Sequence, residues 1–232
     1  MKVIFHSHAF LEIQKDDYSI LIDPYINWNT YCDVSLDDIC KKNIKLILIT
    51  HWHMDHIWDT PFIVNKVWTK VVSTFEVIQF LIKEYNIPSF HSMHIGWSFD
   101  FEWVKVKFVN AVHGGWVGPN LLWWKAAGII VEINWKKIYH AWDTALTYDM
   151  KLLEEEKLDL AFLPIWDNFT MWIKDAIKAV EFIKPKMVVP IHYNTFDTIK
   201  QDPEVFKNEV EMRSLSSWKV LNPWEYIVFD NI

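Results

Sequence analysis

The stretch that most constrains this chain is Thr50-His51-Trp52-His53-Met54-Asp55-His56, which follows an apolar run at residues 44–49. That run is short, rich in β-branched residues and ends at a polar cluster, which predicts a buried strand. Three imidazoles and one carboxylate directly past a buried strand need something to compensate their polarity. A divalent cation would do so, and we favour it over a histidine-rich surface loop because a buried strand leads into the motif.

The spacing within the motif suits two ions. In an extended or tightly turning backbone, His51 and His53 point the same way, while Asp55 and His56 stand one short turn later. Three further candidates lie later in the chain, each just past an expected buried strand: His113, Asp143 and His192. Functional groups of layered α/β folds collect in loops beyond strand ends, so we expect these residues to converge.

The rest of the chain alternates between strand and helix patterns. Strands are expected within residues 2–23, with a turn at 14–17, and at 70–74, 104–109, 128–133, 137–140, 158–165 and 187–191. Helices are expected at 75–85 and at about 147–156, 174–184 and 203–212, with loop and a short helix at 24–43. His91 and His94 are expected in a loop and are left out of the ligand set. We predict one α/β domain over residues 1–232.

Composition excludes several classes of function. No segment has the roughly 18 to 20 uninterrupted apolar residues of a membrane span, and the N-terminus lacks a cleavage site, so a cytoplasmic protein is expected. The net charge is -7 and Arg213 is the single arginine, which disfavours nucleic acid as a partner. Cys32 and Cys40 form no recognisable pair and are expected to be reduced thiols.

The pattern His51-x-His53-x-Asp55-His56, followed by His113, Asp143 and His192, resembles the ligand set of the metallo-β-lactamase superfamily. Five further segments resemble its small, single-domain metal-dependent hydrolases related to ascorbate-6-phosphate lactonase. They are His6-Ser7-His8, Leu21-Ile22-Asp23-Pro24 and residues 138–144, 167–171 and 190–196. The similarity runs from residue 1 to about 229 and implies a four-layer αβ/βα sandwich, with two mixed sheets and outer helices.

The resemblance also implies roles for single residues. His51, His53 and His113 would hold one ion, and Asp55, His56 and His192 the other, with Asp143 bridging. Asp23 would orient a ligand imidazole and His8 would lie at the lip of the pocket. Asn168, Thr170 and Asn194 flank the site and could contact substrate, although turn and cap chemistry would explain them too.

The chemistry implied is hydrolysis. Two cations about 3.5 to 4 Å apart can share a water and lower its pKa, so the nucleophile would be a metal-bridging hydroxide, with Asp55 as the catalytic residue that orients it or shuttles its proton. Imidazole and carboxylate ligands suit zinc, manganese, nickel or iron. The substrate would be a small molecule with an ester-type bond, cleaved by a phosphodiesterase or lactonase activity.

Two alternatives come from other classes of protein. A redox di-iron centre is disfavoured, because the relatives that carry one typically have glutamate where this chain has His53, and come with a flavin domain. A non-catalytic or inactivated metal-binding protein gains weight from the composition: the chain has 15 Trp and 5 Gly, whereas average usage predicts roughly 16 Gly.

The tryptophans stand where the family pattern has glycine, at Trp52, Trp58, Trp142, Trp166 and Trp172. Glycine serves such places through positive φ or close backbone approach. Either tryptophan replaces glycine in an ordinary family member, or the indoles are real and distort the site. Exposed tryptophans would also favour association into a homo-oligomer.

Overall fold

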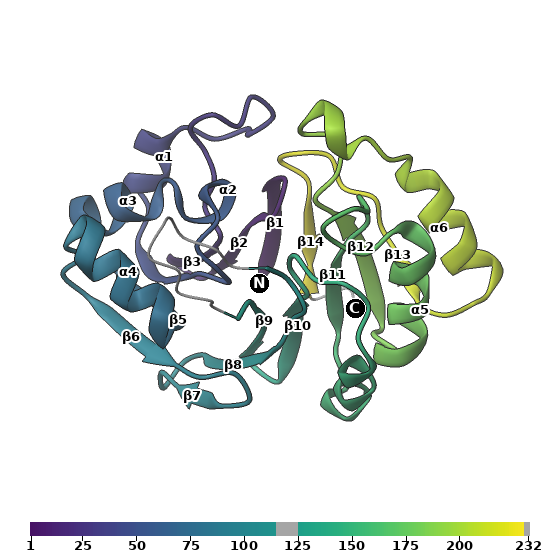
Figure 1. The fold of residues 1–232 in the computed structure, drawn as a ribbon. Coiled ribbons are helices and arrows are strands. Elements are labelled where there is room, and N and C mark those ends of the chain that lie inside the picture. The colour runs from purple at the N-terminus through teal and green to yellow at the C-terminus, as the bar shows by residue number, and fades with distance from the viewer. Residues whose placement is uncertain (115–124, 230–232) are drawn as a thin grey trace. The chain divides into compact units, whose positions relative to one another are not determined.

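The structure is a computed structural model that describes residues 1–114 and 125–229 (Figure 1). These residues form two compact units. The first unit contains Met1–His94 and residues 222–229, and the second contains Ile95–Gly114 and Lys125–Leu221. Each unit has one seven-stranded sheet and its own helices, so the expected α/β class and two mixed sheets are confirmed.

The sheet of the first unit has the strand order β14-β1-β2-β3-β4-β5-β6. Its strands are β1 (Lys2–Ser7), β2 (Phe10–Lys15), β3 (Tyr18–Ile22), β4 (Ile44–Leu48), β5 (Lys70–Thr74), β6 (Phe90–Met93) and β14 (Tyr226–Val228). The helices of this unit are α1 (Leu36–Cys40), α2 (Met54–Ile57), α3 (Thr60–Val67) and α4 (Phe75–Tyr85). Pairing is antiparallel from β14 to β3 and parallel from β3 to β6.

The sheet of the second unit has the order β13-β12-β11-β10-β9-β8-β7. Its strands are β7 (Ser98–Asp100), β8 (Lys105–Asn110), β9 (Ala127–Ile133), β10 (Lys136–His140), β11 (Leu160–Pro164), β12 (Met187–Ile191) and β13 (Ser217–Trp218). Its helices are α5 (Ile173–Ile183) and α6 (Pro203–Met212), with the 3₁₀ helices η1 (Tyr148–Glu156) and η2 (Asp197–Ile199). Pairing is antiparallel from β7 to β10 and parallel from β10 to β13. The two sheets therefore share one pairing pattern, as a diverged duplication would produce.

In the first unit, helices pack on one face of the sheet. Val77, Ile78 and Leu81 of α4 are buried and belong to one core cluster with Ile47 of β4 and Val71 of β5. Their spacing puts them on one side of the helix. This packing fixes the loop between β4 and α3, which carries the histidine-rich motif.

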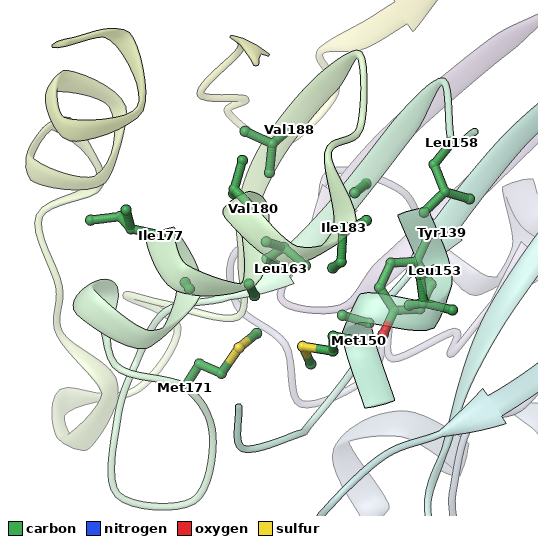
Figure 2. Close-up of a cluster of buried hydrophobic side chains, with 14 of the residues drawn as sticks. Tyr139, Met150, Leu153, Leu158, Leu163, Met171, Ile177, Val180, Ile183 and Val188 are labelled. Atoms are coloured by element: carbon green, nitrogen blue, oxygen red, sulfur yellow. The ribbon is translucent and has the colours of Figure 1, made fainter. Parts of the chain in front are cut away.

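The second unit repeats this arrangement, and Figure 2 shows its core cluster. Ile177, Val180 and Ile183 of α5 are buried with Leu163 of β11 and Val188 of β12. The cluster holds the parallel strands in place, and Asp143 and His192 stand just past the ends of two strands of this sheet, β10 and β12.

Most expected elements agree with the structure, and two differ. The helix expected at 147–156 is a 3₁₀ helix. The expectation that His91 lies in a loop is wrong, because Phe90–Met93 forms β6 and His91 pairs with Val72 of β5. Because β6 is partly exposed along most of its length, it lacks the apolar run that marks a buried strand.

Candidate metal centre

The motif of the first unit gathers imidazoles at the end of β4. The ring centroids of His51 and His53 are 4.2 Å apart, and those of His51 and His56 are 4.3 Å apart. His53 stands in extended conformation immediately before α2, so the chain turns sharply between His53 and His56. Imidazoles packed this closely would repel one another as cations, and their lone pairs suit metal binding.

Asp23, which directly follows β3, orients the ring of His56. The Asp23 carboxylate accepts hydrogen bonds from the backbone N–H and the hydroxyl of Thr50, and from Nδ1 of His56 at 2.9 Å. Because Nδ1 of His56 donates its hydrogen there, the neutral ring carries its lone pair on Nε2, which lies 3.6 Å from Asp55 Oδ2. A carboxylate behind a histidine is the usual support of a metal-binding imidazole.

His8 supports the other ligand of this group. Its Nε2 lies 3.0 Å from Oδ2 of Asp55, and the ligand atoms of His8, Asp55 and His56 all lie within 4.8 Å of one another. Burial lowers the pKa of His8 below its usual value of 6.5, although Asp55 opposes that effect. A neutral His8 therefore donates to Asp55. His8 is buried, whereas the family resemblance implied a place at the lip of a pocket.

In the second unit, Asp143 lies between two imidazoles. Its Oδ1 is 3.1 Å from Nε2 of His192, and its Oδ2 is 3.6 Å from Nε2 of His113. Nδ1 of His113 donates to the backbone carbonyl of Phe169 at 2.9 Å. This bond leaves the lone pair of His113 on Nε2, the atom that faces Asp143. The sequence contained no signal for the Phe169 contact, because a backbone carbonyl belongs to every residue.

Two of the three residues expected near substrate have hydrogen bonds within their own loops. The amide oxygen of Asn194 accepts from the N–H of Gln201 at 2.9 Å, which is turn chemistry. Thr170 is buried and its hydroxyl donates to the carbonyl of Met171. Asn168 lies exposed in the turn after β11 with a positive φ of 59°.

The loops that carry candidate residues adopt left-handed backbone conformations. The φ angles are 104° at Ser7, 59° at His8, 48° at Asp23, 66° at Trp142, 70° at Asp167, 59° at His192 and 61° at Asn194. Such conformations cost free energy in residues other than glycine and gather at functional sites, where surrounding contacts enforce them. Several candidate residues therefore stand in backbone conformations that the surrounding contacts must hold.

Tryptophan rings lie against the candidate histidines. The centroid of Trp52 is 4.9 Å from that of His53, that of Trp142 is 5.4 Å from His113, and that of Trp166 is 5.5 Å from His192. Trp166 is stacked on its histidine with an interplanar angle of 13°.

The donor sets of both units fit transition metals. The first unit offers His51, His53, Asp55 and His56, and the second offers His113, Asp143 and His192. Neutral imidazoles with carboxylates suit zinc, manganese, iron or nickel. The supporting bonds to Asp23 and to the Phe169 carbonyl orient two of the imidazoles for this purpose.

Comparison with known proteins assigns the chain to a family. The model of the β-lactamase superfamily domain matches residues 18–193. The chain belongs to this superfamily. Within it, the chain is 42% identical over 216 residues to a UPF0173 metal-dependent hydrolase of Anoxybacillus flavithermus, covering 91% of this chain and 94% of that protein.

Solved structures agree with this membership. The metallo hydrolase Igni18 from the archaeon Ignicoccus hospitalis superposes with a TM-score of 0.87 at 29% identity, over 97% of both chains. The metallo-β-lactamase fold protein YhfI from Bacillus subtilis superposes with a TM-score of 0.77 at 12% identity, over 97% of this chain and 98% of that one. This β-lactamase superfamily member thus has the metallo-β-lactamase fold. None of its helices in the described part of the chain is long and apolar enough to cross a membrane.

Proposed function

We propose that the protein is a metal-dependent hydrolase that cleaves a small ester-type bond with two divalent cations. The observation that carries the proposal is the pair of imidazole and carboxylate sets at the strand ends, each with a histidine whose lone pair is directed by a supporting bond. His51, His53 and His113 would hold one cation, and Asp55, His56 and His192 the other, with Asp143 bridging. The names of the relatives, metal-dependent hydrolases, support the same reading.

Asp23 and His8 position two of the proposed metal ligands, His56 and Asp55. Asp23 holds His56 in the tautomer that presents Nε2. His8 donates to Oδ2 of Asp55 and so holds that carboxylate in place. When bound, the cations would lower the pKa of a water that they share and neutralise charge on the substrate's oxygens. Asp55 is the residue we assign to orient that water.

The two substrate classes proposed are phosphodiesters and lactones. Only one arginine is present in the chain, so an anionic substrate would be neutralised by cations rather than by guanidinium groups. Lactones follow from the family resemblance. Both classes need an activated water and a stabilised oxyanion, which is the chemistry that the proposed centre supplies.

The test is to load the purified protein with zinc, manganese or nickel and to measure hydrolysis of bis(p-nitrophenyl) phosphate and of a simple γ-lactone. We expect turnover of one of the two, reduced roughly 10²- to 10⁴-fold by Asp55→Asn. Asp159→Asn is the control, because Asp159 is a buried carboxylate whose partners are the Lys137 N–H and lysine side chains, away from the histidine-rich motif. Metal-loaded protein without turnover of either substrate, or equal rates in Asp55→Asn, would refute the proposal.

A further inference from the structure

Five tryptophans have left-handed backbone conformations. Their φ angles are 68° at Trp28, 56° at Trp68, 65° at Trp135, 66° at Trp142 and 71° at Trp224. A positive φ is uncommon for any residue but glycine, and for a bulky side chain it is an outlier. Among the described residues, tryptophan occupies five such positions and asparagine, which tolerates them best, occupies four.

The β9–β10 hairpin shows most directly what this backbone requires. Ile133 pairs with Lys136, so Asn134 and Trp135 form a two-residue loop, and both have positive φ, 50° and 65°. Positive φ at both central residues defines a type I′ turn, for which Asn-Gly is the preferred sequence. The side chain of Trp135 is 90% exposed, so packing gives no reason for an indole there.

Two other turns carry different glycine signatures. In Asn222-Pro223-Trp224-Glu225, the N–H of Glu225 donates to the carbonyl of Asn222 at 3.1 Å. Pro223 at the second position and Trp224 at the third, with a φ of 71°, identify a type II turn. The third residue of such a turn is normally glycine. Trp68 ends α3 in the left-handed conformation with its N–H bonded to the Val64 carbonyl, which is the usual place of a terminating glycine.

We propose that Trp28, Trp68, Trp135, Trp142 and Trp224 are glycine positions of this fold, and that the codon read as tryptophan there specifies glycine in the cell of origin. The codon UGA is read as tryptophan in some genetic codes and as glycine in others. If UGA codons for glycine are translated as tryptophan, the sequence gains tryptophans and loses glycines at the same positions. This explains why it has 15 Trp and only 5 Gly. Three unrelated turn types agree on the same residue, which chance substitution would not produce.

Trp142 is the one of these five tryptophans that lies beside proposed metal ligands. Its indole is fully buried and lies edge-on to the ring of His113, next in sequence to Asp143. Glycine at this position would leave the volume of an indole beside two proposed ligands. This space is where we place a small substrate, a consequence that rests on the proposed function, whereas the glycine assignment does not.

The stability test compares single variants by their thermal unfolding midpoints, measured with chelator so that metal binding has no part. Trp135→Gly and Trp224→Gly should each raise the midpoint, by roughly 2 to 4 °C. Trp97→Gly is the control, because Trp97 is also exposed, 70%, but does not have a positive φ. Its midpoint should not rise. Equal responses of all three variants would overturn the proposal.

The direct test is peptide mass spectrometry of the protein purified from its own source cells, together with the codons of its gene. We expect glycine in the peptides that span residues 134–135 and 222–225, and UGA at all five positions. Tryptophan in those peptides would overturn the proposal whatever the stability of the variants. Neither test depends on whether the protein hydrolyses an ester.

Discussion

The residues that support the candidate ligands have effects that can be separated from folding. Asp23→Asn replaces the acceptor of the His56 Nδ1 hydrogen with a side chain that can itself donate. We expect metal affinity to fall roughly 10- to 100-fold, because the asparagine no longer holds His56 in the tautomer that presents Nε2. Isothermal titration of the metal-free protein with zinc measures this effect.

The control for Asp23→Asn is Asp159→Asn, a buried carboxylate with a backbone donor of its own. It should lower stability and leave zinc affinity unchanged. Equal affinities for zinc in both variants would mean that Asp23 has only a structural role.

Much of the candidate centre could be predicted at the residue scale, because metal ligands are a small set of residue types at characteristic spacings. Asp23 contacts His56 and Asp143 contacts His192, while the roles of both carboxylates at a metal stay predictions. The bond from His113 to the Phe169 carbonyl could not be predicted. His113 is an ordinary type of metal ligand, but the oxygen that its Nδ1 contacts belongs to the backbone of Phe169, in the turn after β11.

At the scale of elements, one buried network ties β1 and β2 to the loop before α1. His6 Nδ1 is 2.6 Å from Asp33 Oδ1, and its Nε2 is 3.0 Å from Glu12 Oε2. An imidazole with a carboxylate at each nitrogen donates at both, so it is charged. Burial lowers the pKa of His6, but the two carboxylates outweigh burial and raise it above 6.5.

This network predicts a pH optimum of stability. Burial raises the pKa of Glu12, but bonds from His6, Lys42 and Ser19 outweigh it and lower the pKa from 4.5 to about 2. Stabilisation by Glu12 is present above pH 4.5 and is lost as pH falls towards 2. Stabilisation by His6 is complete below pH 6.5 and is lost as pH rises through its raised pKa.

The urea unfolding midpoint of the metal-free protein should therefore be higher at about pH 5.5 than at about pH 8.5. His6→Asn should remove most of this difference, since asparagine does not titrate. An unchanged difference in the variant would assign the pH dependence to other groups.

A second element-scale prediction concerns Asp59, which precedes α3. Its carboxylate accepts from the N–H groups of Ile26 and Asn27 at 2.7 and 2.9 Å and holds the loop after β3. Asp59→Ala leaves both donors unpaired and should cost about 1 to 3 kcal/mol. Hydrogen exchange at Ile26 and Asn27 should accelerate in this variant. Asp37→Ala, at an exposed carboxylate bonded to Lys66, should leave both stability and exchange at the loop nearly unaltered.

Elements with a strong local pattern were predictable, and the short edge strands were not. The strand and helix at 70–74 and 75–85 agree with β5 and α4, because β-branched residues and then a one-sided apolar repeat define them. β7, β13 and β14 have two or three residues each, and most of them are exposed or partly exposed. These segments are strands because each pairs with the edge of a neighbouring strand. The local sequence pattern carries no sign of that pairing.

At the scale of the whole molecule, the proposed metal binding is linked to the stability of the folded chain. Ions that bind the folded chain stabilise it by mass action, by about 2.7 kcal/mol at a free concentration 100 times the dissociation constant. The thermal midpoint should therefore fall with chelator and return with zinc or manganese. In His56→Asn, zinc or manganese should restore less of the thermal midpoint. Full recovery of the midpoint in this variant would argue against His56 as a ligand.

Elemental analysis of the purified protein after loading with zinc, manganese or nickel would count the bound ions directly. We expect two ions per chain, and fewer in Asp143→Asn, since Asp143 is the proposed bridge. No bound metal under any of the three loadings, or an equal content in that variant, would contradict this expectation.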